Sequence, residues 1–129
     1  MRIIKTVLKW LLAIAFIFAG INHFINTDFY LSIMPPYLPW HLAAVYLSGI
    51  IEIILGIMLL IPKTQKLAAW GIILLLIAVF PANIYMAMNV EKFPQFSPTM
   101  IYLRILLQFV LIAWAFWFTR EELAYELRE

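Results

Sequence analysis

The chain has 129 residues, of which 66% are hydrophobic and 12% are charged, and its formal net charge is +2. Soluble domains are about 45–50% apolar and about 25% charged, so the apolar excess of this small chain must partly face lipid. The slight, dispersed positive charge excludes a nucleic-acid-binding surface. The absence of cysteine excludes disulfides, thiol relays and thiolate metal sites, and with only two histidines we expect no metal site.

Four apolar segments are each long enough to cross a hydrocarbon core of about 30 Å. They cover approximately residues 7–24, 42–61, 67–88 and 100–118. The first has the basic start of a secretion signal, but because its apolar run continues past Ala19 we interpret it as a retained membrane helix. Lipid offers the backbone no hydrogen-bonding partner, so all four should be helices. The sequence therefore predicts an all-α membrane protein, a four-transmembrane-helix bundle forming one domain over residues 1–129.

Two of the connections carry recognisable signals. The first, residues 25–41, is rich in aromatic residues and proline, so we expect it to lie in the headgroup layer. Asp28 is expected to cap a short turn of helix that runs to Met34. In the third connection, Ser97 is the expected N-cap of the last helix, with Pro98 at its first position.

Basic residues set the orientation. Four spanning helices place both chain ends and the second connection on the same side of the membrane. The basic residues on that side are Arg2, Lys5, Lys9, Lys63, Lys66, Arg120 and Arg128, whereas the connections on the other side contain only Lys92. Because positive residues stay in the cytoplasm, we predict that both termini are cytoplasmic and that the 25–41 connection is an outer loop. The tail, residues 119–129, is then cytoplasmic, and the spacing of Leu123 and Leu127 predicts a short continuation of the last helix.

Polar side chains inside the apolar segments are the candidate functional residues, since each ionisable group costs about 2.5–3.5 kcal/mol to insert. They are Asn22, His23, Glu52, Asn83, Arg104 and Gln108. In the predicted orientation all of them lie at the centre or in the outer half of the membrane, with Glu52 about 15 Å below the outer end of its helix. We therefore predict an outward-facing polar pocket that is closed below by apolar side chains.

Glu52 is the central candidate. Ser48, Gly49 and Gly56 surround it at helical spacing, which lets a neighbouring helix approach closely and turns the carboxylate toward the bundle. Arg104 is its expected partner, because a guanidinium can hold a carboxylate with two parallel hydrogen bonds. Three interpretations stay open: the two form a structural ion pair, they form a ligand or proton site, or they never meet.

The remaining candidates also have more than one interpretation. His23 is either an interfacial residue with one satisfied ring nitrogen or a group for proton exchange or quinone binding. Asn22 and Asn83 either hold helices together or bind a ligand. Gln108 shares one helix face with Arg104 through its i, i+4 spacing.

Five local strings carry a family resemblance. They are Gly20–Phe24, Ile33–Trp40, Ser48–Gly56, Phe80–Tyr85 and Arg104–Gln108. In this order and spacing, from about Lys9 to Trp117, the chain resembles the DoxX-like family of small bacterial membrane proteins. The resemblance implies a four-helix bundle in the bacterial inner membrane. The family is named after a subunit of a thiosulfate:quinone oxidoreductase, which implies a link to quinone chemistry.

Two functions follow as hypotheses, and neither settles whether the protein is an enzyme. The first is a subunit of a redox-linked, quinone-associated membrane system, with a quinone in the pocket beneath an aromatic lid. No redox centre is encoded, so electrons would come from a partner or a bound cofactor. The second is a non-enzymatic assembly factor or structural partner of other membrane proteins, acting through small-residue faces or as a homo-oligomer. A transporter is less favoured, because the apolar inner half leaves no path through the bundle.

Overall fold

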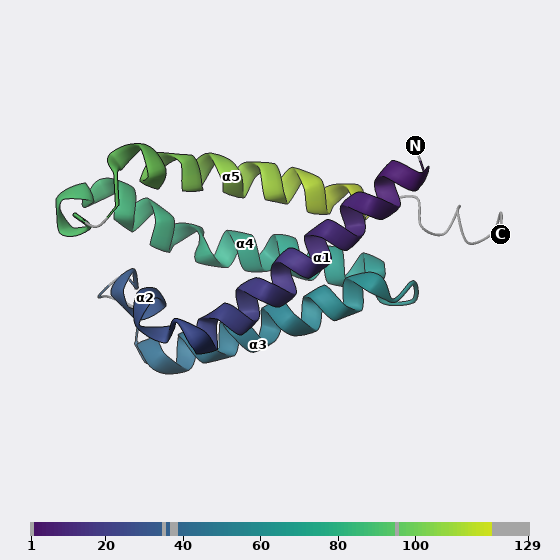
Figure 1. The fold of residues 1–129 in the computed structure, drawn as a ribbon, viewed down its shortest axis with the longest axis horizontal. Coiled ribbons are helices and arrows are strands. Elements are labelled where there is room, and N and C mark those ends of the chain that lie inside the picture. Colours follow the sequence, from purple (N-terminus) through teal and green to yellow (C-terminus); the bar gives the residue numbers. More distant parts are fainter. Residues whose placement is uncertain (1, 35, 37–38, 95, 120–129) are drawn as a thin grey trace.

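The computed structural model describes residues 2–34, 36, 39–94 and 96–119. Within these residues the secondary structure is entirely helical (Figure 1). The elements in chain order are α1 (Arg2–Ile25), α2 (Thr27–Ser32), α3 (His41–Leu60), α4 (Gln65–Met88), the 3-10 helix η1 (Val90–Lys92) and α5 (Pro98–Trp117). In this described part of the chain, α1, α3, α4 and α5 are long and apolar enough to cross a membrane. The protein is therefore a multi-pass helical membrane protein.

The four long helices match the predicted segments to within about two residues, except that α1 begins at Arg2 rather than near Val7. The basic side chains of Lys5 and Lys9 do not interrupt α1, because residues of other parts of the bundle contact both of them. Lys5 is buried against the rings of Trp117 and Phe118. Lys9 donates a hydrogen bond of 3.2 Å to Gln65 at the start of α4.

The expectation for Asp28 is wrong. Asp28 lies inside α2 rather than before it, and the helix starts after Asn26 and ends at Ser32. The reason is that α2 follows α1 almost without interruption. The backbone N–H of Asn26 donates to the carbonyl of Asn22, and the Thr27 hydroxyl donates to the carbonyl of His23 at 2.9 Å. The predicted helical continuation at Leu123 and Leu127 lies outside the described residues.

The predicted start of α5 is confirmed: Ser97 is its N-cap, its hydroxyl accepts a hydrogen bond from the Met100 N–H, and Pro98 occupies the first turn. Replacing Ser97 by alanine removes this cap and should lower the free energy of unfolding by about 1 kcal/mol. Equilibrium unfolding in mixed micelles would measure the change. The matched control is Thr99→Ala, an exposed position in the same turn, which should change stability by less than about 0.5 kcal/mol. Equal effects of the two changes would contradict the capping role.

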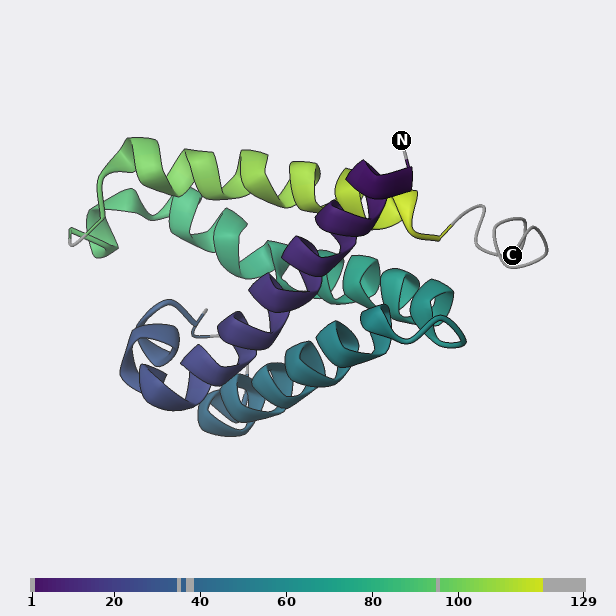
Figure 2. The ribbon, with the colours of Figure 1, turned by 45° about the vertical axis from the view of Figure 1, so that its right-hand side comes forward.

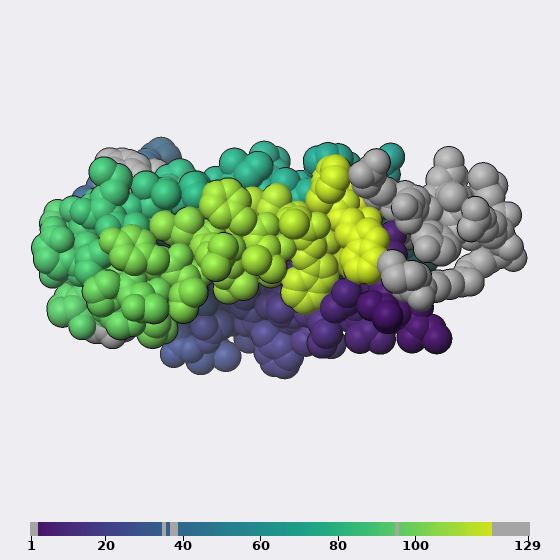
Figure 3. Space-filling view, turned by 90° about the horizontal axis from the view of Figure 1, so that it is seen from above, coloured from purple at the N-terminus to yellow at the C-terminus, as the bar shows by residue number. Residues whose placement is uncertain are grey.

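The long helices form two antiparallel pairs, α1 with α3 and α4 with α5 (Figure 1). The pairs come together at the end where the first and last described residues lie, which we call the terminal end. They diverge toward the opposite end, which carries α2 and which we call the α2 end (Figures 1 and 2). Figure 3 shows the face of the molecule over which α5 lies. Leu103, Leu106 and Phe109 are exposed apolar side chains of α5. This surface suits contact with lipid.

An apolar core fills the terminal half of the bundle. Its buried members are Leu12, Ala13, Phe16, Leu59, Ala68, Ala69, Ile72, Ile73, Leu76, Ala115 and Phe118. All four long helices, together with the residue that ends α5, contribute to it. The predicted apolar closure beneath the polar residues is thus present.

A second, smaller apolar cluster lies at the α2 end, and we call it the lid. Its buried members are Ile33, Met86, Phe93 and Ile101, with Phe29 and Phe96 packed against them. The rings of Phe29 and Phe96 meet edge to face, 5.6 Å apart. The lid therefore joins the two helix pairs across the gap that opens between them.

The backbones of α1 and α3 touch at glycines. A Cβ atom on Gly20 would overlap the carbonyl oxygen of Gly49, and a Cβ on Gly56 would lie 2.8 Å from the carbonyl oxygen of Ala13. A Cβ on Gly49 would lie 2.8 Å from the Cβ of His23. The close approach predicted from the small residues of α3 is confirmed, and its partner is α1.

Candidate functional site

A cavity of about 190 Å³ lies between the two helix pairs, and residues of the lid and the core both contribute to its wall. Its polar lining consists of His23, Tyr30, Ser48, Glu52, Asn83 and Arg104. Phe16 and Leu76, which belong to the core, also line it. The four long helices and α2 thus each contribute to one cavity, with apolar walls and a few polar groups, which is the usual character of a small-molecule site.

The structure brings four of the six predicted site residues together in this cavity: His23, Glu52, Asn83 and Arg104. The other two do not line it. Asn22 donates a hydrogen bond of 2.8 Å to the hydroxyl of Tyr30, and Gln108 donates one of 3.1 Å to the backbone carbonyl of Leu76. Both bonds join separate helices, so these two amides have the helix-joining role.

The ionisable partner of Glu52 is His23 and not Arg104. The Nε2 atom of His23 lies 2.9 Å from Oε2 of Glu52. The expected pairing with Arg104 is wrong because the glycine contacts place α3 directly against α1, whereas α5 belongs to the other helix pair, across the cavity. A pair of ionisable side chains is present, but it joins α1 to α3.

The other ring nitrogen of His23 determines where the protons lie. Its Nδ1 is 2.9 Å from the carbonyl oxygen of Val45 and 3.2 Å from the hydroxyl of Ser48. A carbonyl oxygen can only accept, so Nδ1 must carry a hydrogen and donate it. A close contact between Nε2 and Glu52 then needs a further proton between them. The pair is either imidazolium with carboxylate or imidazole with carboxylic acid.

One carboxyl oxygen of this pair has a single close partner within the described residues. Oε2 of Glu52 is buried, and its close polar neighbour among the described residues is Nε2 of His23, at 2.9 Å. Each oxygen of a carboxylate has two lone pairs, so Oε2 can accept from a second partner as well. Because Glu52 lines the cavity, a bound molecule with a donor or a shared proton can supply that partner.

The opposite wall carries a cation. Nε of Arg104 donates a long hydrogen bond of 3.4 Å to the side-chain oxygen of Asn83, and Asn83 is buried. Among the described residues, no carboxylate forms an ion pair with Arg104. A guanidinium has five N–H groups, so Arg104 retains donors for a ligand oxygen. The cavity therefore has a proton-bearing pair on one side and a hydrogen-bond donor on the other.

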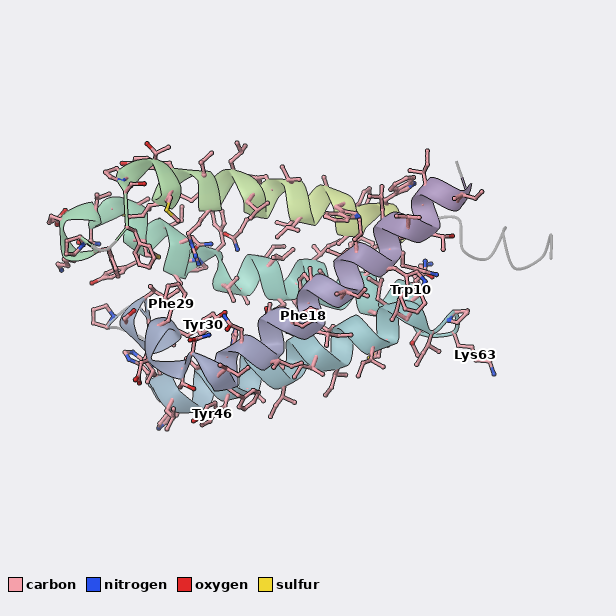
Figure 4. The ribbon with its side chains drawn as sticks, in the orientation of Figure 1. Trp10, Phe18, Phe29, Tyr30, Tyr46 and Lys63 are labelled. Carbon is pink, nitrogen blue, oxygen red and sulfur yellow. The ribbon has the colours of Figure 1, made fainter. Side chains whose placement is uncertain are left out.

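The sequence analysis missed Tyr30 and the hydroxyl of Ser48. Tyr30 reaches from α2 to α1 (Figure 4), where its ring lies 4.0 Å from the ring of His23. No sequence signal separates Tyr30 from the other aromatic residues of its segment. Ser48 was counted only as a small residue, and its proximity to Nδ1 of His23 follows from the register of α1 on α3. The sequence did contain one signal, Gly20, which lies one turn before His23. A glycine at this position allows α3 to lie directly against α1.

Comparison with known proteins gives one finding of similarity. A family model described as "Domain of unknown function (DUF8561)" matches residues 12–119. The matched range includes every cavity-lining residue described above. No curated protein matches the chain, and no solved structure does.

Proposed function

The chain belongs to the family described as domain of unknown function DUF8561, and we propose that it is a subunit of a redox-linked membrane system that holds a quinone in its cavity. One observation carries the proposal: hydrogen-bonding groups stand on opposite walls of a single apolar cavity. His23 and Glu52 form one wall group, and Asn83 and Arg104 form the other.

A quinone ring matches this arrangement. Its two carbonyl oxygens lie on opposite edges of a flat apolar ring, so one can accept from Arg104 while the other faces the proton shared by His23 and Glu52. Dry cavities of about 150 Å³ hold benzene, and this cavity of about 190 Å³ has room for one substituted ring. Phe16 and Leu76 would contact the ring faces.

In this proposal the chain binds the quinone and supplies a proton at Glu52. It does not supply the electrons that reduce the quinone. Electrons would come from a partner protein, which makes the molecule a subunit rather than a complete oxidoreductase. The resemblance to the DoxX-like family supports this division, since it links the chain to a quinone-dependent system.

We place the protein in the bacterial inner membrane with its terminal end in the cytoplasm. Lys5, Lys9, Lys63 and Lys66 belong to the terminal end, and Lys92 belongs to the α2 end. Retention of positive residues in the cytoplasm favours this orientation. Both termini are then cytoplasmic, and the cavity lies in the outer half of the membrane, beneath the lid.

The alternative, a non-enzymatic assembly factor, loses one of the observations that motivated it. Besides the small size of the chain and its lack of a soluble domain, that hypothesis rested on small-residue faces, which are typical of contacts between membrane helices. Gly20, Gly49 and Gly56 use these faces for contacts within the chain. They are therefore not open for a partner protein.

The proposal is tested with decyl-benzoquinone as the probe. Glu52→Gln keeps the size of the side chain but removes the acidic proton, so the dissociation constant should rise about tenfold, which is about 1.4 kcal/mol. Quenching of tryptophan fluorescence in purified protein would measure it. The matched control is Glu91→Gln, an exposed carboxylate in η1 outside the cavity, which should bind like the wild type. Undiminished binding by Glu52→Gln would reject the site.

A further inference from the structure

We propose that Tyr30 is a specificity-determining residue of the cavity: its hydroxyl group donates a hydrogen bond to an oxygen substituent of the ligand, beside the carbonyl that Arg104 holds. This inference rests on the proposed function, because it treats the cavity as a quinone site. It adds a residue that contacts the ligand, and it narrows the ligand class to quinones that carry an oxygen substituent on the ring.

Tyr30 lies where the two polar walls of the cavity approach each other. It lines the cavity from α2, and its ring lies 4.0 Å from the ring of His23 (Figure 4). The side chain is also close enough to the guanidinium of Arg104 to interact with it electrostatically. Tyr30 therefore contacts one polar wall with its ring and is within reach of the cation on the other.

The hydroxyl oxygen of Tyr30 is held by Asn22. The side-chain N–H of Asn22 donates to it at 2.8 Å. Asn22 is oriented in turn by Asn26, whose side-chain N–H donates to Oδ1 of Asn22. Because Asn26 occupies this oxygen, the amide N–H of Asn22 faces Tyr30. In this arrangement the hydroxyl of Tyr30 accepts a hydrogen bond, and Asn22 does not use its hydrogen.

The hydroxyl hydrogen of Tyr30 is the group that a ligand can use. A phenol has one O–H to donate in addition to its lone pairs, and in the part of the chain that the structure describes no group accepts it. The nearby guanidinium of Arg104 cannot accept, because it has only donors. The O–H of a tyrosine packed in a protein usually finds a partner, and a ligand oxygen in the cavity would be one.

Two neighbouring donors select two neighbouring acceptors. In the proposed function Arg104 donates to one carbonyl oxygen of the quinone. The position beside a carbonyl on a quinone ring belongs to the next ring substituent. If the first atom of that substituent is oxygen, it can accept from Tyr30. If it is carbon, the O–H of Tyr30 stays without a partner, which costs free energy. The cavity therefore favours a quinone with a methoxy or hydroxyl group over one with alkyl groups alone.

The experiment compares two probes by equilibrium binding to protein in lipid nanodiscs: dimethoxy-methyl-benzoquinone, and trimethyl-benzoquinone, in which methyl groups replace the methoxy groups. Tyr30→Phe removes only the hydroxyl and keeps the ring beside His23. The dissociation constant for the dimethoxy probe should rise about fivefold, the usual contribution of one hydrogen bond. That for the trimethyl probe should not rise, because this probe offers the hydroxyl no acceptor. Tyr46→Phe, at a tyrosine of α3 outside the cavity, is the matched control and should bind both probes like the wild type.

A second variant tests the direction of the hydrogen bond between Asn22 and Tyr30. In Asn22→Asp the side chain keeps its size but can only accept when it is ionised. The hydrogen of Tyr30 would then turn to the new carboxylate and be lost to the ligand. This variant should weaken the dimethoxy probe about as much as Tyr30→Phe does, and the trimethyl probe less than about twofold. Weakening of both probes alike would show that Asn22 has only a structural role.

The outcomes for Tyr30→Phe separate this inference from the proposed function. Unchanged binding of the dimethoxy probe would show that the hydroxyl does not contact the ligand. Equal weakening of both probes would show that Tyr30 does not distinguish the oxygen substituent, and would overturn its role in specificity. Failure of the wild type to bind either probe would reject the proposed function itself, and this inference with it.

Discussion

Replacing His23 by leucine is expected to lower the free energy of unfolding by about 3–5 kcal/mol, because removal of one member of a buried ionisable pair leaves the other without its partner. The remaining carboxyl of Glu52 would lie at lipid depth, where an isolated charge is costly. The carbonyl of Val45 would also lose the donor at Nδ1 of His23. Equilibrium unfolding in mixed micelles would measure the loss.

A double-mutant cycle separates the pair from its two members. Substituting leucine at both His23 and Glu52 removes the charge together with its partner, so the double variant should recover most of the stability lost by His23→Leu alone. The matched control is His41→Leu, since His41 lies at the start of α3 and does not line the cavity. Its effect should be below about 1 kcal/mol. If the effects of the two cavity substitutions simply add, the proposed coupling between His23 and Glu52 is absent.

Replacing Gly20 by alanine is expected to lower the free energy of unfolding by about 1–3 kcal/mol, the usual cost of overpacking a tight contact. Helix propensity alone would favour alanine by about 1 kcal/mol. The added Cβ, however, would overlap the backbone carbonyl of Gly49 and lie 2.6 Å from Cγ1 of Ile53. Backbone atoms of α3 cannot turn aside, so α1 and α3 would have to separate.

The matched control is Gly71→Ala. Its Cβ would approach only the side chain of Leu55, with Cδ2 at 2.6 Å, and this methyl can move by a rotamer change. We therefore expect the stability of Gly71→Ala to stay within about 1 kcal/mol of the wild type. The two glycines should differ in ligand binding too, since separation of the helices at Gly20 would move His23 away from Glu52. Equal stability of the two alanine variants would contradict the close contact.

The membrane helices could be predicted from sequence because the bilayer imposes strong rules. A backbone in hydrocarbon must satisfy its own hydrogen bonds, so each long apolar run had only one plausible structure. Ser97 and Pro98 mark the start of α5 by chemistry that acts within one turn. The gathering of polar residues toward one end followed from depth alone, since depth is counted along each helix.

The partner of Glu52 could not be predicted in the same way. Arg104 was favoured by its length and permanent charge, but the structure shows that neighbouring helices decide the pairing. That neighbourhood depends on Gly20 meeting Gly49, a contact between segments far apart in the sequence. His23 thereby reaches Glu52, and Arg104 is left on the opposite wall.

The direction in which each side chain points around its helix axis could not be predicted either. Asn22 and His23 are adjacent in sequence and lie at the same depth, but successive residues of a helix point about 100° apart. Only His23 lines the cavity, whereas Asn22 points to Tyr30. Arg104 and Gln108 do share a face, as their spacing indicates. Gln108, however, lies one turn closer to the core and donates a hydrogen bond to the backbone carbonyl of Leu76.

The most direct test is an experimental structure of the protein in a lipid nanodisc with decyl-benzoquinone. We predict density for the ring between the carboxyl group of Glu52 and the guanidinium of Arg104, with the contact between His23 and Glu52 retained. Density for the probe at any other place, or Glu52 and Arg104 directed into separate compartments, would contradict the assignment of one shared cavity as the ligand site.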